Sequence, residues 1–270
     1  MATDPLQDFS RTTFSFANKE RTVYRAGEGT AVIVLAELPG ITPKVADFAR
    51  RVVARGHTVF MPSLFGEDGA EGTVAQVAKV APRVCVSREF QAFALRTTPP
   101  AIDWLRALAR HAHAECGGPG VGAVGMCFTG GFALGMSVEP ALLAPVLSQP
   151  SLPIGFGDQR TGDLAISDTD LLRVIERTQT EDLCVLGLRF THDRLAPRNR
   201  FRTLQRTLGD AFIGVEIDSS KGNPWGHRAA AHSVLTEDLI DEPGQPTHDA
   251  LEQVLDFFDE RLAAEPAAAD

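Results

Sequence analysis

The stretch VGAVGMCFTGGFALGM (residues 121–136) decides the fold, because it joins a short apolar run to a helix-like run through a cysteine set among glycines. Residues 121–125 predict a buried strand, and the apolar residues after Cys127 predict a helix. Gly125 lies two positions before the cysteine, and Thr129 lies two after it. Small neighbours permit the sharp strand-to-helix turn that presents a nucleophile above a parallel sheet. The stretch therefore predicts a nucleophile elbow, with a buried structural cysteine as the alternative.

Outward from this turn, apolar runs alternate with amphipathic ones. A hairpin is expected over 12–25. Strands are expected at 30–37, 57–62, 183–190 and 211–217, and a short one at 144–147. Helices are expected at 44–56, from Pro99–Pro100 onward, and at 167–178, 198–208 and 248–262. This alternation predicts an α/β fold with a mostly parallel sheet and helices on both faces. No linker divides the chain, so one domain over 1–270 is expected, with an ordered core at roughly 11–262.

Composition narrows the partners and the compartment. A formal net charge of −9 argues against a nucleic-acid partner. No apolar run approaches the roughly 20 residues that cross a bilayer, and residues 1–22 lack the pattern of a secretory signal. The four cysteines form no CxxC pair, which favours reduced thiols over a zinc site. A cytoplasmic protein is expected, with no membrane partner.

A thiol nucleophile needs a base, and the base needs an acid to orient it. Asp193 follows the predicted strand 183–190, while His227 and His232 follow the strand 211–217. This order of nucleophile, acid and histidine is that of α/β-hydrolases. Each residue alone could be an ordinary loop residue, but the three agree in order and position. The residues by themselves leave either histidine open as the base.

Nearly the whole chain resembles the dienelactone hydrolase family of α/β-hydrolases. The resemblance rests on VLAELPG (34–40), VFMPSLFG (59–66) and GAVGMCFTGG (122–131). It implies the α/β-hydrolase fold and a triad of Cys127, Asp193 and His232. The stretch AHSVLT (231–236) resembles the family pattern around its histidine and so favours His232 over His227. The family commonly has glycine where this chain has Thr129, which is expected to narrow the turn.

The resemblance also implies roles for the loop after strand 30–37. The backbone N–H groups of Leu38 and Phe128 are expected to form the oxyanion hole. Glu37 corresponds to a family glutamate that keeps the resting thiol protonated and accepts its proton when substrate arrives. A nearby carboxylate disfavours a thiolate, which makes this role physically sensible.

The expected substrate is a small ester, lactone or thioester, with no metal or cofactor, and the protein is expected as a monomer or homodimer. Family members that act on dienelactone have an arginine shortly after the histidine. This chain has none there, which argues against dienelactone itself as the substrate. Arg88 is a candidate anion contact or a surface arginine, and Trp225 and Phe65 are candidate pocket walls. A redox-sensing thiol protein and a catalytically silent relative remain as alternatives.

Overall fold

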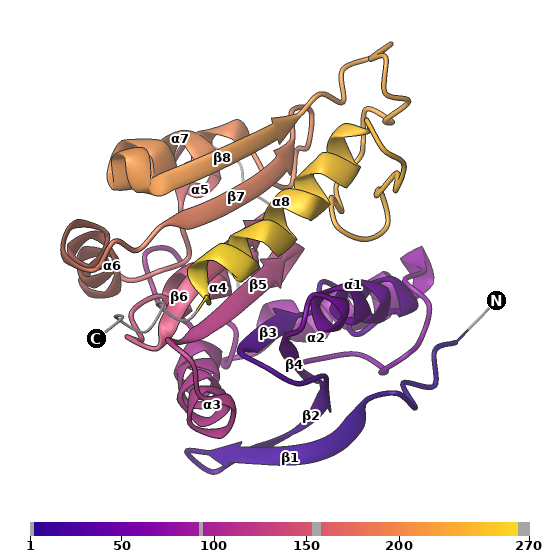
Figure 1. Ribbon diagram of the computed structural model, residues 1–270. Helices are drawn as coiled ribbons and strands as arrows, with labels where there is room; N and C mark the ends of the chain where they lie inside the picture. Colours follow the sequence, from indigo (N-terminus) through magenta and orange to yellow (C-terminus); the bar gives the residue numbers. More distant parts are fainter. Residues whose placement is uncertain (1–2, 92–93, 153–157, 264–270) are drawn as a thin grey trace, which may run out of the picture.

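One eight-stranded sheet runs through the computed structural model, which describes residues 3–91, 94–152 and 158–263 (Figure 1). The spatial order is β1-β2-β4-β3-β5-β6-β7-β8. The strands are β1 (Ser10–Phe16), β2 (Lys19–Ala26), β3 (Ala31–Leu35), β4 (Thr58–Pro62), β5 (Val121–Met126), β6 (Leu142–Ser148), β7 (Val185–Phe190) and β8 (Phe212–Ile217). The β1–β2 and β2–β4 pairs are antiparallel, and every other neighbouring pair is parallel. The predicted α/β-hydrolase fold is confirmed.

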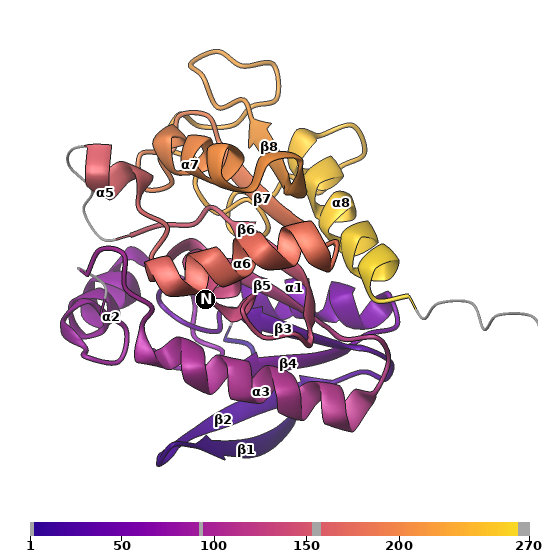
Figure 2. The ribbon, with the colours of Figure 1, turned by 90° about the vertical axis from the view of Figure 1, so that its left-hand side faces the viewer.

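Helices cover both faces of this sheet (Figures 1 and 2). They are α1 (Pro43–Ala54), α2 (Val74–Val86), α3 (Pro100–Cys116), α4 (Gly130–Met136), α5 (Asp158–Gly162), α6 (Asp168–Thr180), α7 (Arg198–Leu208) and α8 (Pro246–Arg261). The central strand β3 is buried on both sides: Val32 and Val34 pack into the cluster with α1 and α8, while Ile33 packs with α3 on the other face. Alternate side chains of a strand point to opposite faces, so an unbroken apolar run suits this position.

Two short segments depart from the expected pattern. The strand expected at 30–37 ends at Leu35, which leaves Glu37 and Leu38 in the loop above the sheet. Helix α5 was not expected, because its five polar or small residues, DQRTG, carry no apolar periodicity. Between β4 and α3 the chain also contains α2, which continues through Pro82.

Residues that precede β1 pack against the rest of the fold. Leu6 and Phe9 are 4% and 5% exposed and belong to the core cluster on the α1 face. The backbone N–H of Asp4 donates to Gly69, and its carboxylate pairs with Arg50. These contacts hold residues before β1 against the sheet, and no apolar periodicity in so short a segment could predict them. No helix in the described part of the chain is long and apolar enough to cross a membrane.

Candidate active site

Cys127 lies where β5 ends and a single 3₁₀ turn (η1, Cys127–Thr129) leads into α4. Its φ angle is +52°, a left-handed conformation that non-glycine residues rarely adopt. Gly125 explains how the turn closes, because a Cβ at this position would lie 2.1 Å from the Thr129 carbonyl oxygen. The backbone therefore folds back tightly on itself and presents the partly buried cysteine at the carboxyl edge of the sheet.

The Thr129 hydroxyl forms hydrogen bonds within the turn and to the end of β3. It accepts a hydrogen bond from the Met126 N–H at 2.9 Å and lies 3.1 Å from the Leu35 carbonyl and 3.2 Å from that of Ala36. The side chain is fully buried. The hydroxyl thus connects the cysteine turn to the end of β3, immediately before Glu37. A glycine at this position could not make that connection.

Asp193 and His232 form a close polar pair in the site. The Asp193 Oδ2 lies 2.6 Å from the His232 Nδ1, and its Oδ1 accepts the N–H groups of Leu195 and Ala196 at 2.8 and 3.2 Å. The aspartate side chain is only 3% exposed and that of the histidine 16%. These bonds fix the carboxylate and the imidazole orientation. The second ring nitrogen of His232, Nε2, is buried and makes no hydrogen bond within the described part of the chain.

A buried arginine supports the loop that carries Asp193. Arg189, on β7, is 1% exposed and donates to the carbonyl oxygens of Thr191 (3.1 Å) and Ala196 (2.8 Å). It also pairs with Glu216 on the neighbouring strand β8. The guanidinium therefore binds both ends of the short loop 191–196, which sets the position of Asp193 between them.

Glu37 lies beside the cysteine and the histidine. A carboxylate oxygen of Glu37, the Cys127 sulfur and a ring nitrogen of His232 all lie within 4.8 Å of one another. The glutamate is 4% exposed. Its carboxylate accepts hydrogen bonds from Ser233 Oγ at 2.7 Å, from Gln149 Nε2 at 3.3 Å and from the Thr236 hydroxyl. Buried carboxylates need such partners, and here the partners also fix the orientation of the group.

The charges around His232 favour its protonated form. Burial opposes an imidazolium, but the Cys127 sulfur and the Asp193 carboxylate outweigh that penalty and raise the pKa of His232 above its ordinary value. The imidazolium is therefore the natural partner of a Cys127 thiolate. His227 differs: burial lowers its pKa, and its ring packs edge-on against Phe190 at 5.0 Å.

The structure brings the two histidines to different places. His232 contacts Asp193 and lies near Cys127, whereas His227 is 7% exposed and has an Nε2 without a partner among the described residues. The favoured residue, His232, is thus the one placed with the other members of the predicted triad.

The predicted oxyanion-hole residues flank Cys127 on two segments. Phe128 follows the cysteine directly, and Leu38 follows Glu37 in the loop after β3. Both pack with Cys127 against the apolar cluster on the α3 face of the sheet. Among the backbone hydrogen bonds of the turns and loops that the structure describes, none has the N–H of Leu38 or of Phe128 as its donor.

The three predicted substrate contacts are not equally close to this site. Phe65 meets the ring of Phe128 at 6.3 Å and that of Phe90 at 5.9 Å, so it belongs to an aromatic wall next to the elbow. Trp225 is 38% exposed on the loop after β8. Arg88 is exposed and forms no ion pair within the described residues. The structure does not bring Trp225 or Arg88 to Cys127.

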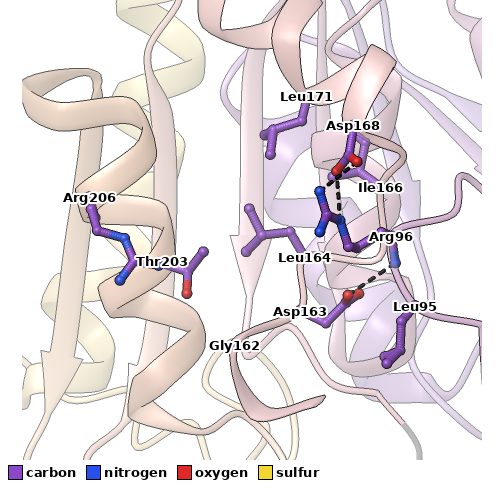
Figure 3. Close-up of a pocket in the computed structure, with 10 residues that line it drawn as sticks. All are labelled: Leu95, Arg96, Gly162, Asp163, Leu164, Ile166, Asp168, Leu171, Thr203 and Arg206. Carbon is purple, nitrogen blue, oxygen red and sulfur yellow. Dashed lines mark hydrogen bonds and ion pairs between the residues drawn. The ribbon is translucent and has the colours of Figure 1, made fainter. Parts of the chain in front are cut away.

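Two surface pockets differ in which of the predicted site residues line them. One of about 570 Å³ lies between α6 and α7, where Arg96 pairs with Asp168 and Arg206 projects from the opposite side (Figure 3). None of the predicted catalytic residues lines it. A second pocket, of about 340 Å³, is lined by Phe65, Phe90 and the α2 residues Lys79 and Arg83. The predicted catalytic residues do not line this pocket either, but its Phe65 and Phe90 contact the ring of Phe128 next to Cys127, so it is the better candidate for a substrate group.

Sequence reasoning missed the residues that hold the site in place. Gln149 follows β6, and its side chain contacts both Glu37 and the Val234 N–H. Asp238 accepts the backbone N–H groups of His232 (2.7 Å) and Ser233 (3.1 Å). Gln149 is a polar residue directly after a buried strand, and this position could have marked it as a candidate site residue. Asp238 carried no signal, because its role depends on how the loop folds back.

Comparison with known proteins places this geometry in a family. A model of the dienelactone hydrolase family matches residues 16–262. The chain belongs to the dienelactone hydrolase family. As a member of it, the protein is a hydrolase that acts on esters. A search of curated proteins found no significant match.

Solved structures of similar fold include other dienelactone hydrolases. A putative dienelactone hydrolase from Klebsiella pneumoniae is 17% identical, with a TM-score of 0.58, and 93% of this chain covers 98% of that one. The dienelactone hydrolase from Anabaena variabilis is 14% identical, with a TM-score of 0.60 and coverages of 95% and 100%. P91, a dienelactone hydrolase-like promiscuous phosphotriesterase from metagenomic libraries, is 14% identical, with a TM-score of 0.63 and coverages of 97% and 100%. These likenesses show the shared fold.

Proposed function

We propose that this family member hydrolyses small esters, lactones or thioesters through an acyl-cysteine intermediate on Cys127. The observation that carries the proposal is the convergence of the Cys127 sulfur, a His232 ring nitrogen and a Glu37 oxygen within 4.8 Å, with Asp193 bound to the other side of the imidazole. A nucleophile, a base and an orienting acid are the groups that acyl transfer requires.

In the proposed cycle, the resting thiol is protonated beside the Glu37 carboxylate. When substrate arrives, Glu37 accepts the thiol proton, and the thiolate forms next to the His232 imidazolium. The sulfur attacks the carbonyl carbon, and His232 gives its proton to the leaving oxygen or sulfur. Neutral His232 then removes a proton from water, which attacks the acyl-cysteine. The acid product leaves, and the proton on Glu37 returns to the sulfur.

The oxyanion that forms in each half-reaction needs hydrogen-bond donors. We assign this role to the backbone N–H groups of Leu38 and Phe128, which belong to the two loops on either side of the sulfur. The Thr129 hydroxyl supports the arrangement, because it connects the cysteine turn to the end of β3 just before Leu38.

The pocket beside Phe65 suggests which substrates fit. Its lining combines apolar side chains such as Phe65 and Phe90 with polar ones. Lys79 and Arg83, one helical turn apart on α2, supply two positive charges against the single negative charge of Glu67. An ester whose acyl or alcohol part carries a terminal carboxylate matches this combination. Arg88 is a further candidate anion contact, and Trp225 is a further candidate pocket wall.

The test is hydrolysis of a panel of p-nitrophenyl esters, lactones and thioesters by the wild type and by Cys127→Ala. Activity that Cys127→Ala abolishes supports the proposal, and trapping of the acyl group on the Cys127 peptide identifies the intermediate. Wild-type activity that survives in Cys127→Ala would rule out the cysteine mechanism. A folded wild type that hydrolyses no member of the panel would support the redox or binding alternatives.

A further inference from the structure

We propose that Glu37, Cys127 and His232 form a binding site for Zn²⁺, and that the ion inhibits the enzyme reversibly by occupying its nucleophile. The inhibitory part rests on the proposed function, whereas the binding part does not. Among the described residues these three make a group of metal-ligating side chains whose donor atoms all lie within 4.8 Å of one another. They offer one sulfur, one nitrogen and one oxygen.

The spacing is close to that of a tetrahedral site. Bonds of about 2.0 Å to nitrogen or oxygen and about 2.3 Å to sulfur place the ligand atoms of a tetrahedral zinc ion about 3.5 Å apart. Each pair of donor atoms would therefore approach by about 1.3 Å at most. Small rotations about the side-chain bonds of the three residues provide movements of this size without a change in the fold.

Two of the ligands are already oriented for a metal. Asp193 holds the Nδ1 of His232, so the histidine presents Nε2, and that atom is buried with no hydrogen-bond partner among the described residues. A carboxylate behind a ligating histidine is the usual outer partner in zinc proteins. The Glu37 carboxylate is likewise held by Ser233 and Gln149. An oriented and unpartnered buried nitrogen next to a thiol is a feature that a metal ion would satisfy.

The donor set selects the class of ion. Thiolate and imidazole ligands suit Zn²⁺, while Mg²⁺ and Ca²⁺ prefer oxygen ligands alone. On binding, the thiol gives its proton to solvent and a sulfur–zinc bond forms, with no change of oxidation state. Three protein ligands leave the fourth position to water. The bound sulfur can no longer attack a carbonyl carbon, and Glu37 can no longer accept its proton.

The experiment measures the ion and the activity separately. Metal-free protein is dialysed against Zn²⁺ to obtain its Kd, and Co²⁺ is added to a second sample to look for a cobalt–thiolate charge-transfer band. Esterase activity is followed over the same range of Zn²⁺. Wild type is compared with Cys127→Ala, Glu37→Gln and Asp193→Asn, each checked for folding by thermal melting. The control is His248→Ala, which removes a surface histidine that pairs with Asp241.

Wild type should bind one Zn²⁺, show the cobalt–thiolate band, and lose activity that a chelator restores. The band should vanish in Cys127→Ala. Asp193→Asn removes an outer partner and should raise the Kd by roughly 10–100-fold, and Glu37→Gln, which removes a ligand, should raise it at least as much. His248→Ala should match wild type. Absence of binding, or a Kd unchanged in Cys127→Ala and Glu37→Gln, would overturn the site. Binding with the cobalt band in a protein that hydrolyses no ester would support the site and reject the proposed function instead.

Discussion

The Nδ1 of His232 lies 2.6 Å from the Asp193 carboxylate, and this single contact leaves the buried Nε2 of the same ring for Cys127. The aspartate belongs to the loop after β7 and the histidine to the loop after β8, two neighbouring strands whose carboxyl ends meet at one edge of the sheet. Parallel neighbours therefore bring together residues 39 positions apart.

His232→Ala should reduce kcat for an activated ester by roughly 10²–10⁴-fold, the usual contribution of a positioned acid–base group. His227→Ala should keep most of the activity, because that ring packs on Phe190 and does not contact Asp193. Steady-state kinetics of both variants measure which histidine acts as the base. The opposite pattern would transfer the role of base to His227.

Cys127 should be the first of the four thiols to react with a limiting amount of iodoacetamide. Burial raises the pKa of Cys85, which keeps that thiol protonated and slow. Peptide mapping by mass spectrometry should find the label on Cys127, and activity should fall in proportion to labelling. Labelling of Cys116 or Cys184 first, with activity intact, would contradict this assignment.

Glu37→Gln should make the Cys127 sulfur more reactive, because the neutral amide no longer opposes a negative charge on it. Iodoacetamide labelling of Cys127 at neutral pH should therefore be faster than in the wild type. Turnover should nevertheless fall, since the proposed proton acceptor is missing. An unchanged labelling rate would argue that the carboxylate has no influence on the thiol.

Asp238→Asn should destabilise the protein by roughly 1–3 kcal/mol at neutral pH through its bonds to Arg228 and to the His232 and Ser233 N–H groups. Burial opposes ionisation of Asp238, but these partners outweigh it and lower its pKa. A lowered folded pKa stabilises the protein above the unfolded value of about 3.9, and the effect is lost as the pH falls through the folded pKa. Urea unfolding should therefore show the difference between wild type and variant shrinking below about pH 4. If the difference in unfolding free energy did not change with pH, the charge of Asp238 would not be the source of the stabilisation.

Thr129→Val should cost roughly 1–3 kcal/mol in the free energy of unfolding, because the Met126 N–H loses its buried acceptor. Thr129→Ser retains the hydroxyl and serves as the matched control. Urea unfolding of the three proteins gives the comparison. Equal stability of the valine and wild-type proteins would show that the hydroxyl contributes nothing to the turn.

The sequence predicted the sheet and the elbow well, because buried strands and glycine-flanked turns leave local patterns. It also favoured the histidine that the structure places beside Asp193. The polar partners of Glu37 could not be inferred, since Gln149 and Ser233 lie 112 and 196 residues away along the chain. Gln149 directly follows a buried strand, but that position does not show which residue its side chain contacts. Thr129 was expected to narrow the turn, whereas its hydroxyl bridges to β3. Such bonds depend on side-chain direction in the folded chain, which periodicity does not report.

The bond between Glu37 and Ser233 has a genetic consequence. Ser233 adjoins His232, so one loop positions the proposed base and also holds the carboxylate that lies near the thiol. A substitution at Ser233 disturbs both functions at once, and its effect will not add to that of a change at Glu37. Natural or laboratory variants of this enzyme should therefore show epistasis between these positions, which a double-mutant cycle would measure as a non-zero coupling energy.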